Sequence, residues 1–333
     1  TLRQQISSLS NRWKGKPWLH SATLDFSWSK NEVRFLSLEE REKSPSRANS
    51  DTIWNSSFRS DELASLSVTL LLRTADGLDL RENKVWSFEK LPTSLDTAAI
   101  AQELDSLIVH LQQLKDAPMG EPYAGPVLLE GPAAAVYIHE VLGHRLESHR
   151  LKLKSDGQTF LRKRKERVAP PEISLFDDPT LSHWNGEYLH GHYTADDEGV
   201  AAQKTTLIEK GVLVGLLNSR TTAIASDSSN GHGRGFPPLS RMGNTILTHS
   251  SPQPRDSLRQ MLLQIAKERG LPYALSIQEL QVGYTITSRE LPQSFQLLAL
   301  SAKRIWVDGR PDELLRGINI SGSPLSSLSY IVG

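Results

Sequence analysis

Two histidines and a glutamate lie together at residues 139–144, in the order His-Glu-Val-Leu-Gly-His. Neutral imidazole is the commonest protein ligand of catalytic metals, and a glutamate beside the first histidine often serves as general base for metal-bound water in peptide hydrolysis. The pattern therefore indicates His139 and His144 as metal ligands and Glu140 as the base. The competing interpretation is that two of the ten histidines are ordinary polar side chains that lie close by chance.

The motif is HExxxH, which has one residue more between the histidines than the common HExxH. Residues five apart lie about 140° around a regular helix, so His139 and His144 would diverge on an ideal one. We therefore expect a local distortion, such as a single π-turn, with Gly143 supplying the backbone freedom. Glu140, His144 and Glu147 share one helix face without any distortion.

The composition of the chain limits the classes of function. Its 333 residues are 38% hydrophobic, which suffices for a real core and predicts two domains, with 38 basic and 38 acidic residues. This balance does not favour a nucleic-acid or membrane partner, and the basic run at 150–168 is typical of a solvated loop. We find no apolar run near 18 residues. We expect a cytoplasmic protein, trimmed or processed because it starts at Thr1.

The N-terminal portion, residues 1–117, is expected to hold a small α+β unit. Alternating segments at 22–28 and 32–38 predict two paired strands, and the polar stretch 39–62 predicts a mobile loop. A further strand is expected at 65–73. Apolar residues at helical spacing predict an amphipathic helix over 94–116, beginning at a cap near Asp96.

Residues 118–333 are expected to form a β-rich domain that contains the histidine motif. A buried strand at 125–130 would lead into the helix that carries HExxxH. Segments 204–209 and 212–217 flank Lys210-Gly211, a signal for a β-hairpin, and a helix is expected at 255–269. Strands are predicted at 275–287, 295–307 and 314–321. The predicted fold class is α+β, with mostly antiparallel β-sheets and few helices.

Four separate motifs together resemble one family. These are His-Glu-Val-Leu-Gly-His-Arg-Leu-Glu at 139–147, Asp-Asp-Glu-Gly at 196–199, Asn-Gly-His-Gly-Arg at 230–234 and Arg-Met-Gly-Asn-Thr at 241–245. Their order and spacing are similar to those of the TldD/PmbA family of zinc metalloproteases, from about residue 125 to the end.

The resemblance implies a zinc peptidase, or one using another divalent metal, that hydrolyses small or unfolded peptides in leader trimming or peptide degradation. The peptide would lie extended against a strand edge. The partners implied are this peptide substrate and a related subunit in a homo- or heterodimer. The alternative is a non-catalytic or metal-deficient subunit of a heteromeric protease.

The resemblance also assigns roles to residues. His139 and His144 would bind the metal, Glu140 would act as general base and Glu147 would orient a ligand from outside the metal's own shell. Residues of the Gly-rich and Arg-Met segments would either bind substrate or brace a tight loop: Gly231, His232, Gly233, Arg234, Arg241 and Asn244. Asp196 and Asp197 are expected to be turn and capping residues.

The third metal ligand is the point of departure from the family. Active members place a cysteine near the C-terminus, and this chain contains no cysteine. Either the chain is a fragment or trimmed subunit whose ligand lies on other residues or on a partner, or a local residue replaces the cysteine. The local candidates are an aspartate or one of four histidines: His183, His190, His192 and His232.

Overall fold

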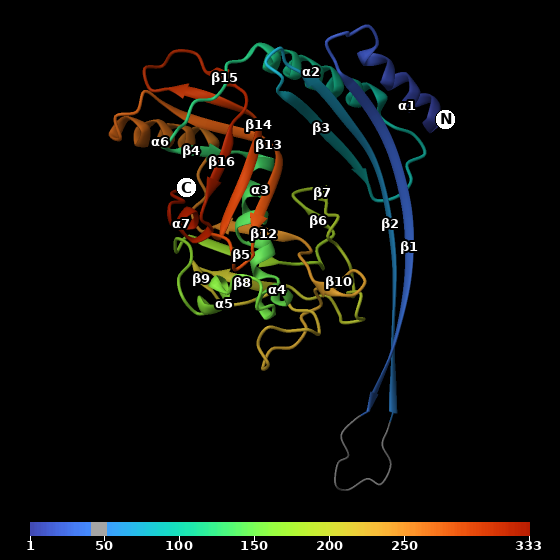
Figure 1. The fold of residues 1–333 in the computed structure, drawn as a ribbon. Helices are drawn as coiled ribbons and strands as arrows, with labels where there is room; N and C mark the ends of the chain where they lie inside the picture. The colour runs from blue at the N-terminus through green and yellow to red at the C-terminus, as the bar shows by residue number, and fades with distance from the viewer. Residues whose placement is uncertain (41–51) are drawn as a thin grey trace.

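The N-terminal part of the computed structural model, which describes residues 1–40 and 52–333, is a three-stranded antiparallel sheet in the order β1-β2-β3. Strands β1 (Ser21–Glu40) and β2 (Thr52–Arg73) form a long hairpin that extends well past the rest of the molecule (Figure 1), and β3 (Asp79–Phe88) pairs only with the second half of β2. Helices α1 (Leu2–Leu9) and α2 (Thr97–Asp116) supply apolar side chains to the core of this part.

The core of this part follows from simple periodicities. Alternate residues of β2 point to one face of the sheet, and residues three and four apart on α2 point back at them. The predicted helix is confirmed, with Asp96 accepting a hydrogen bond from the backbone N–H of Ala99 at 3.0 Å as its N-cap. The buried contributors are Leu66, Val68, Leu70 and Leu72 from β2, and Ile100, Leu104, Ile108 and Leu111 from α2.

Two N-terminal predictions were wrong. Segments 22–28 and 32–38 are not paired strands but parts of the single strand β1, whose register with β2 runs unbroken through Lys30 and Asn31. Residues 39 and 40 of the expected loop belong to β1 and residues 52–62 to β2, while 41–51 lie outside the described residues. The polar composition misled because Ser56 and Ser60 are exposed where the hairpin projects, so a strand there needs few apolar side chains.

The largest sheet of the C-terminal part is built on a long antiparallel pair. Strand β13 (Tyr273–Ile286) pairs with β14 (Ser294–Trp306), and both were predicted from the sequence. Strand β4 (Val127–Leu129) adds to β13 in parallel, and it is half-exposed rather than buried as predicted. The expected strand 314–321 is divided into β15 (Glu313–Leu315) and β16 (Asn319–Gly322), which both pair with β14.

A second sheet of four short strands has the order β12-β5-β8-β9. It consists of β12 (Thr245–His249), β5 (Ile173–Asp177), β8 (Thr205–Glu209) and β9 (Val212–Leu213). The predicted hairpin joins β8 to β9 through Lys210 and Gly211, which have φ values of 46° and 80°. Two-stranded pieces pair β6 (His183–Trp184) with β7 (Glu187–Tyr188), and β10 (Gly233–Arg234) with β11 (Leu239–Ser240).

Helices complete the C-terminal part. The predicted helix at 255–269 is α6 (Arg255–Glu268), which packs near β4 and β13. Short helices occur at α4 (Ser148–Lys152), α5 (Thr159–Arg162) and α7 (Pro324–Ser329), so the basic stretch 150–168 is partly helical rather than a plain loop. Helix α3 (Gly131–Val141) follows β4, runs along β13 and brings the histidine motif toward the smaller sheet (Figure 1).

The molecule is therefore α+β, with mostly antiparallel sheets and few helices, as predicted. Among the described residues, none of the helices has the length and apolar character needed to cross a membrane.

Candidate metal centre

The two histidines of the motif meet at the end of α3. Their Nε2 atoms lie 3.0 Å apart, and the ring planes are at 84° to each other. The predicted distortion is present, but it is not a π-turn: α3 ends at Val141, and a 3₁₀ turn, η2 (Gly143–Leu146), follows. At Leu142 φ is −116°, far from the helical value, so the α-helix stops there and His144 lies on a separate turn rather than on the helix that carries His139.

Gly143 lies where a side chain would displace Met242. A Cβ atom at this position would overlap Sδ of Met242, a residue of the predicted Arg-Met segment. The predicted reason, backbone freedom, is not what the structure shows, because Gly143 is not among the glycines with positive φ. The close approach of Met242 packs the 241–245 segment directly against the turn between the two histidines.

Glu147 contacts the ring nitrogen of His144 that does not face His139. Its buried carboxylate accepts a hydrogen bond from Nδ1 of His144 at 3.2 Å, and others from Arg150 at 2.7 Å and Arg241 at 3.2 Å. Burial alone would raise the pKa of Glu147, but the hydrogen bonds from His144 and Arg150 outweigh it and lower the pKa below its usual value. A charged Glu147 favours the proton on Nδ1, which leaves the Nε2 lone pair of His144 facing His139.

His139 has an environment that suits a neutral imidazole. Although the residue as a whole is exposed, partial desolvation lowers the pKa of His139, the nearby ring of His144 lowers it further, and Glu140 and Glu147 only partly oppose this. In a tetrahedral zinc site with Zn–N distances near 2.05 Å, two ligand nitrogens lie about 3.3 Å apart. A separation of 3.0 Å between the Nε2 atoms therefore fits a shared metal after a shift of a few tenths of an ångström.

Glu140 completes a group of three possible ligands. One ligand atom from each of His139, Glu140 and His144 lies within 4.8 Å of the others, and this is the one such group in the described part of the chain. Glu140 is buried against β13, where a Cβ atom at Gly283 would approach its Cγ to 2.7 Å. Gly283 was missed in the sequence, although a glycine within a strand pattern is a signal of close approach.

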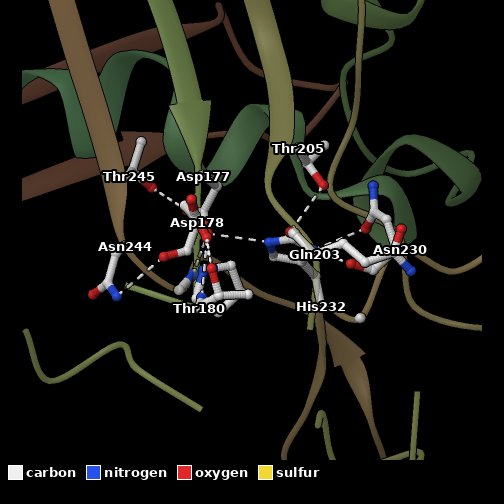
Figure 2. A network of polar contacts seen from close by, with 12 residues as sticks. Asp177, Asp178, Thr180, Gln203, Thr205, Asn230, His232, Asn244 and Thr245 are labelled. Carbon is white, nitrogen blue, oxygen red and sulfur yellow. Dashed lines mark hydrogen bonds and ion pairs between the residues drawn. The ribbon is translucent and has the colours of Figure 1, made fainter. Parts of the chain in front are cut away.

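The Gly-rich loop is held by a buried His-Asp pair. Nε2 of His232 lies 3.1 Å from Oδ1 of Asp177, and Nδ1 lies 2.9 Å from Oδ1 of Asn230 (Figure 2). Both side chains of the pair are fully buried. Because both ring nitrogens have protein partners, His232 is a bracing residue of this loop. Asp177 was not singled out from the sequence, and no short motif marks it.

The glycines of this loop use their backbone groups internally. Gly231 has φ of 75°, and its carbonyl accepts a hydrogen bond from the Tyr193 hydroxyl at 2.9 Å. The N–H of Gly233 donates to Asp196 at 2.9 Å. Asp196 also accepts from the N–H groups of Glu198 and Val200, which confirms its predicted turn role.

The remaining predicted residues also make bracing contacts. Arg234 pairs with Asp197 at 3.3 Å and stacks over Tyr193, with its guanidinium carbon 4.2 Å from the ring centre. Asn244 is buried and donates to the carbonyl of Leu181 at 2.9 Å, and lies beside Asp178 in Figure 2.

Arg241 joins the loop to the metal centre. Its backbone N–H donates to the carbonyl of His232 at 2.9 Å, while its side chain reaches Glu147.

The histidines considered as replacement ligands lie elsewhere. His183 pairs with Glu89 at 3.1 Å, and Nδ1 of His192 lies 3.0 Å from the carbonyl of Pro179. His190 packs edge-on against Tyr188. Neither these residues nor His232 joins the group at the motif.

Comparison with known proteins agrees with this geometry. Residues 122–333 match the sequence model of the PmbA/TldA metallopeptidase C-terminal domain. The chain belongs to the TldD/PmbA family. It is 32% identical to a metalloprotease of Methanocaldococcus jannaschii over 247 residues, which are 73% of this chain and 49% of that protein. It is 29% identical to a metalloprotease of Archaeoglobus fulgidus over 258 residues, 74% of this chain and 56% of the relative. The chain thus spans about half the length of these TldD/PmbA relatives.

The fold is shared with a solved structure. TldE from Thermococcus kodakarensis superposes with a TM-score of 0.63 and 16% identity, over 98% of this chain and 66% of that one. At this identity the likeness shows the TldD/PmbA fold alone.

Proposed function

We propose that this TldD/PmbA chain is a zinc-dependent peptidase that hydrolyses small or unfolded peptides, as in leader trimming or peptide degradation. The observation that carries the proposal is the convergence of the His139 and His144 Nε2 atoms, with Glu147 behind one ring and Glu140 beside both. The metalloprotease names of its relatives support a hydrolytic metal site.

The chain's own residues have distinct tasks in this proposal. A divalent metal bound there would act as a Lewis acid, which polarises the peptide carbonyl and makes water easier to deprotonate. The Glu140 carboxylate accepts a proton from the attacking water and then donates it to the nitrogen of the leaving amine. His139 and His144 hold the metal through Nε2, and Glu147 orients His144 through Nδ1.

The Gly-rich segment 230–234 and the Arg-Met segment 241–245 brace the metal centre without contributing ligands to it. Ser229, Asp196 and Asp197 accept the N–H groups of Gly231, Gly233 and Gly235, so these amides are already engaged. We therefore assign bracing rather than substrate contact to Gly231, His232, Gly233, Arg234, Arg241 and Asn244.

A third ligand would come from a related subunit or from other residues of a longer protein. Catalytic zinc normally takes three protein ligands and a water, and this chain contributes two histidines and no cysteine. The absent cysteine also favours a second candidate, a non-catalytic subunit that binds peptides for an active partner.

Replacement of Glu140 by glutamine tests the proposed base. Glutamine keeps the size of the side chain but cannot accept the proton, so cleavage of an unfolded casein substrate should fall about 10²–10⁴-fold while metal content stays unchanged. Peptidase assay and elemental analysis of the protein with its partner measure the two quantities. Unchanged cleavage would remove Glu140 from the mechanism, and a wild-type complex without metal at this chain would favour the non-catalytic subunit.

A further inference from the structure

Arg145, the residue after His144, carries a buried guanidinium group. It is 4% exposed, and each of its hydrogen-bond acceptors in the described part of the chain is uncharged. The acceptors are Oε1 of Gln293 at 2.6 Å, Oγ1 of Thr285 at 2.8 Å, and the carbonyls of Ile286 and Ser294 at 3.0 Å each. Burial of a charge is costly unless hydrogen bonds compensate for the lost water, so these bonds must be formed together.

The acceptors lie at the two ends of the connection between β13 and β14. Thr285 and Ile286 end β13, and Ser294 begins β14. One planar guanidinium therefore ties both strands to the 3₁₀ turn that carries His144. A lysine could not replace it, since an ammonium group lacks the fork that reaches several acceptors at fixed angles.

The same strand also meets the proposed base. Residues two apart on a strand point to the same face, so Gly283 and Thr285 both face the HExxxH segment. Glu140 lies against Gly283, and Arg145 bonds to Thr285. A slip of one residue would bring the large ring of Tyr284, now 58% exposed, against Glu140. The register of β13 thus determines how much room the Glu140 carboxylate has.

The connection itself is also bound by the chain after α4. The N–H of Gly157 donates to the carbonyl of Thr287, and the N–H of Arg289 to the carbonyl of Ser155, both at 2.7 Å. These backbone bonds fix the connection to a neighbouring segment but do not reach the metal centre. Arg145 supplies that link.

We infer that Arg145 is a positioning residue, which holds the end of β13 in register with the HExxxH segment and thereby fixes the Glu140 carboxylate relative to the two histidines. The inference rests on the proposed function only in the role given to Glu140. The structural link between Arg145 and residues 284–294 can be tested without any peptidase activity.

Arg145→Met is the main test, made in the protein with its partner. Amide hydrogen exchange across 284–294 should accelerate at least about tenfold. Local opening of this segment in the wild type must break the hydrogen bonds of Arg145, and in the variant it need not. The visible spectrum of bound cobalt(II) should stay unchanged, because both histidines remain. The kcat for unfolded casein should fall about 10–100-fold with little change in KM, since a small misplacement of a catalytic group is costly.

Three further variants make the outcome decisive. Arg304→Met removes another buried arginine, which pairs with Glu313 on β15, and should leave exchange at 284–294 unchanged. Arg145→Lys should behave like Arg145→Met, whereas wild-type behaviour would show that charge alone suffices and overturn the inference. If Arg145→Met fails to fold, Thr285→Val, which removes one acceptor, should show a smaller change in the same direction.

Unchanged exchange at 284–294 in the folded Arg145 variants, or in Thr285→Val if they do not fold, would also overturn the inference. A wild-type protein that neither binds cobalt(II) nor cleaves casein would instead refute the proposed function, and the exchange result would still decide whether Arg145 holds the strand.

Discussion

At the scale of single residues, the centre depends on how each imidazole is oriented. Glu147 is fully buried and accepts from His144, Arg150 and Arg241 at once. Its negative charge is thus held in place by two guanidinium groups, and it directs the proton of His144 to Nδ1. The metal-binding atom of His144 is therefore selected by a residue that does not itself belong to the ligand group.

Glu147→Gln should weaken zinc binding by about 10–100-fold, because the amide keeps the shape of the side chain but loses the charge that orients His144. Competition with a fluorescent chelator measures the zinc affinity of the complex. Glu166→Gln is the matched control, since the Glu166 side chain forms an exposed ion pair with Lys163. Equal zinc affinity in the Glu147 variant and the wild type would contradict the orienting role.

At the scale of elements, the turn between the histidines depends on contacts with a distant segment. The sequence motif alone predicts that the helix must deviate after Glu140, and it does. The kind of deviation could not be predicted, because Met242 packs where a Cβ of residue 143 would lie, and this contact exists only in the folded chain. Local periodicity suffices to predict α2, because its buried side chains pack against a single sheet.

Gly143→Ala should lower the free energy of unfolding by about 1–3 kcal/mol, because the added methyl group overlaps Met242 in a packed interior. Urea denaturation measures the loss. The double variant Gly143→Ala/Met242→Ala supplies the control: the two changes should cost less together than the sum of the single costs. Strict additivity would show that the two residues do not clash, and that Gly143 is needed for another reason.

The candidate site shows the same division between local and distant information. His139, Glu140, His144 and Glu147 could be found because they lie within nine consecutive residues. Asp177 and Gly283 could not be assigned, since their partners His232 and Glu140 are distant in sequence and meet them only in the folded chain. The Gly-rich loop was recognised as a motif, but its bracing contacts depend on the folded chain.

At the scale of the whole molecule, a polar contact marks where the N-terminal part meets β13. His110 of α2 lies 3.3 Å from the buried carboxylate of Glu82 on β3, with Glu279 of β13 and Lys303 of β14 nearby. The hydrogen bond with Glu82 raises the pKa of His110 more than its burial lowers it. Burial and the charge of Glu82 raise the pKa of Glu279.

His110→Gln should destabilise the protein more at about pH 6 than at about pH 9. A raised folded-state pKa means that the His110 contribution is fully present below the unfolded value near 6.5, and is lost as the pH rises through the folded value. The difference between the urea midpoints of the wild type and the variant, measured at both pH values, gives the comparison. An equal or larger difference at the higher pH would contradict the assigned pairing.

The central claim is that His139 and His144 bind one metal ion through their Nε2 atoms. Anomalous diffraction at the zinc edge, from crystals of the zinc-loaded protein with its partner, tests this most directly and also identifies the third ligand. We expect a single strong peak about 2.0–2.1 Å from both Nε2 atoms. Well-ordered His139 and His144 side chains with no anomalous peak between them would contradict the account.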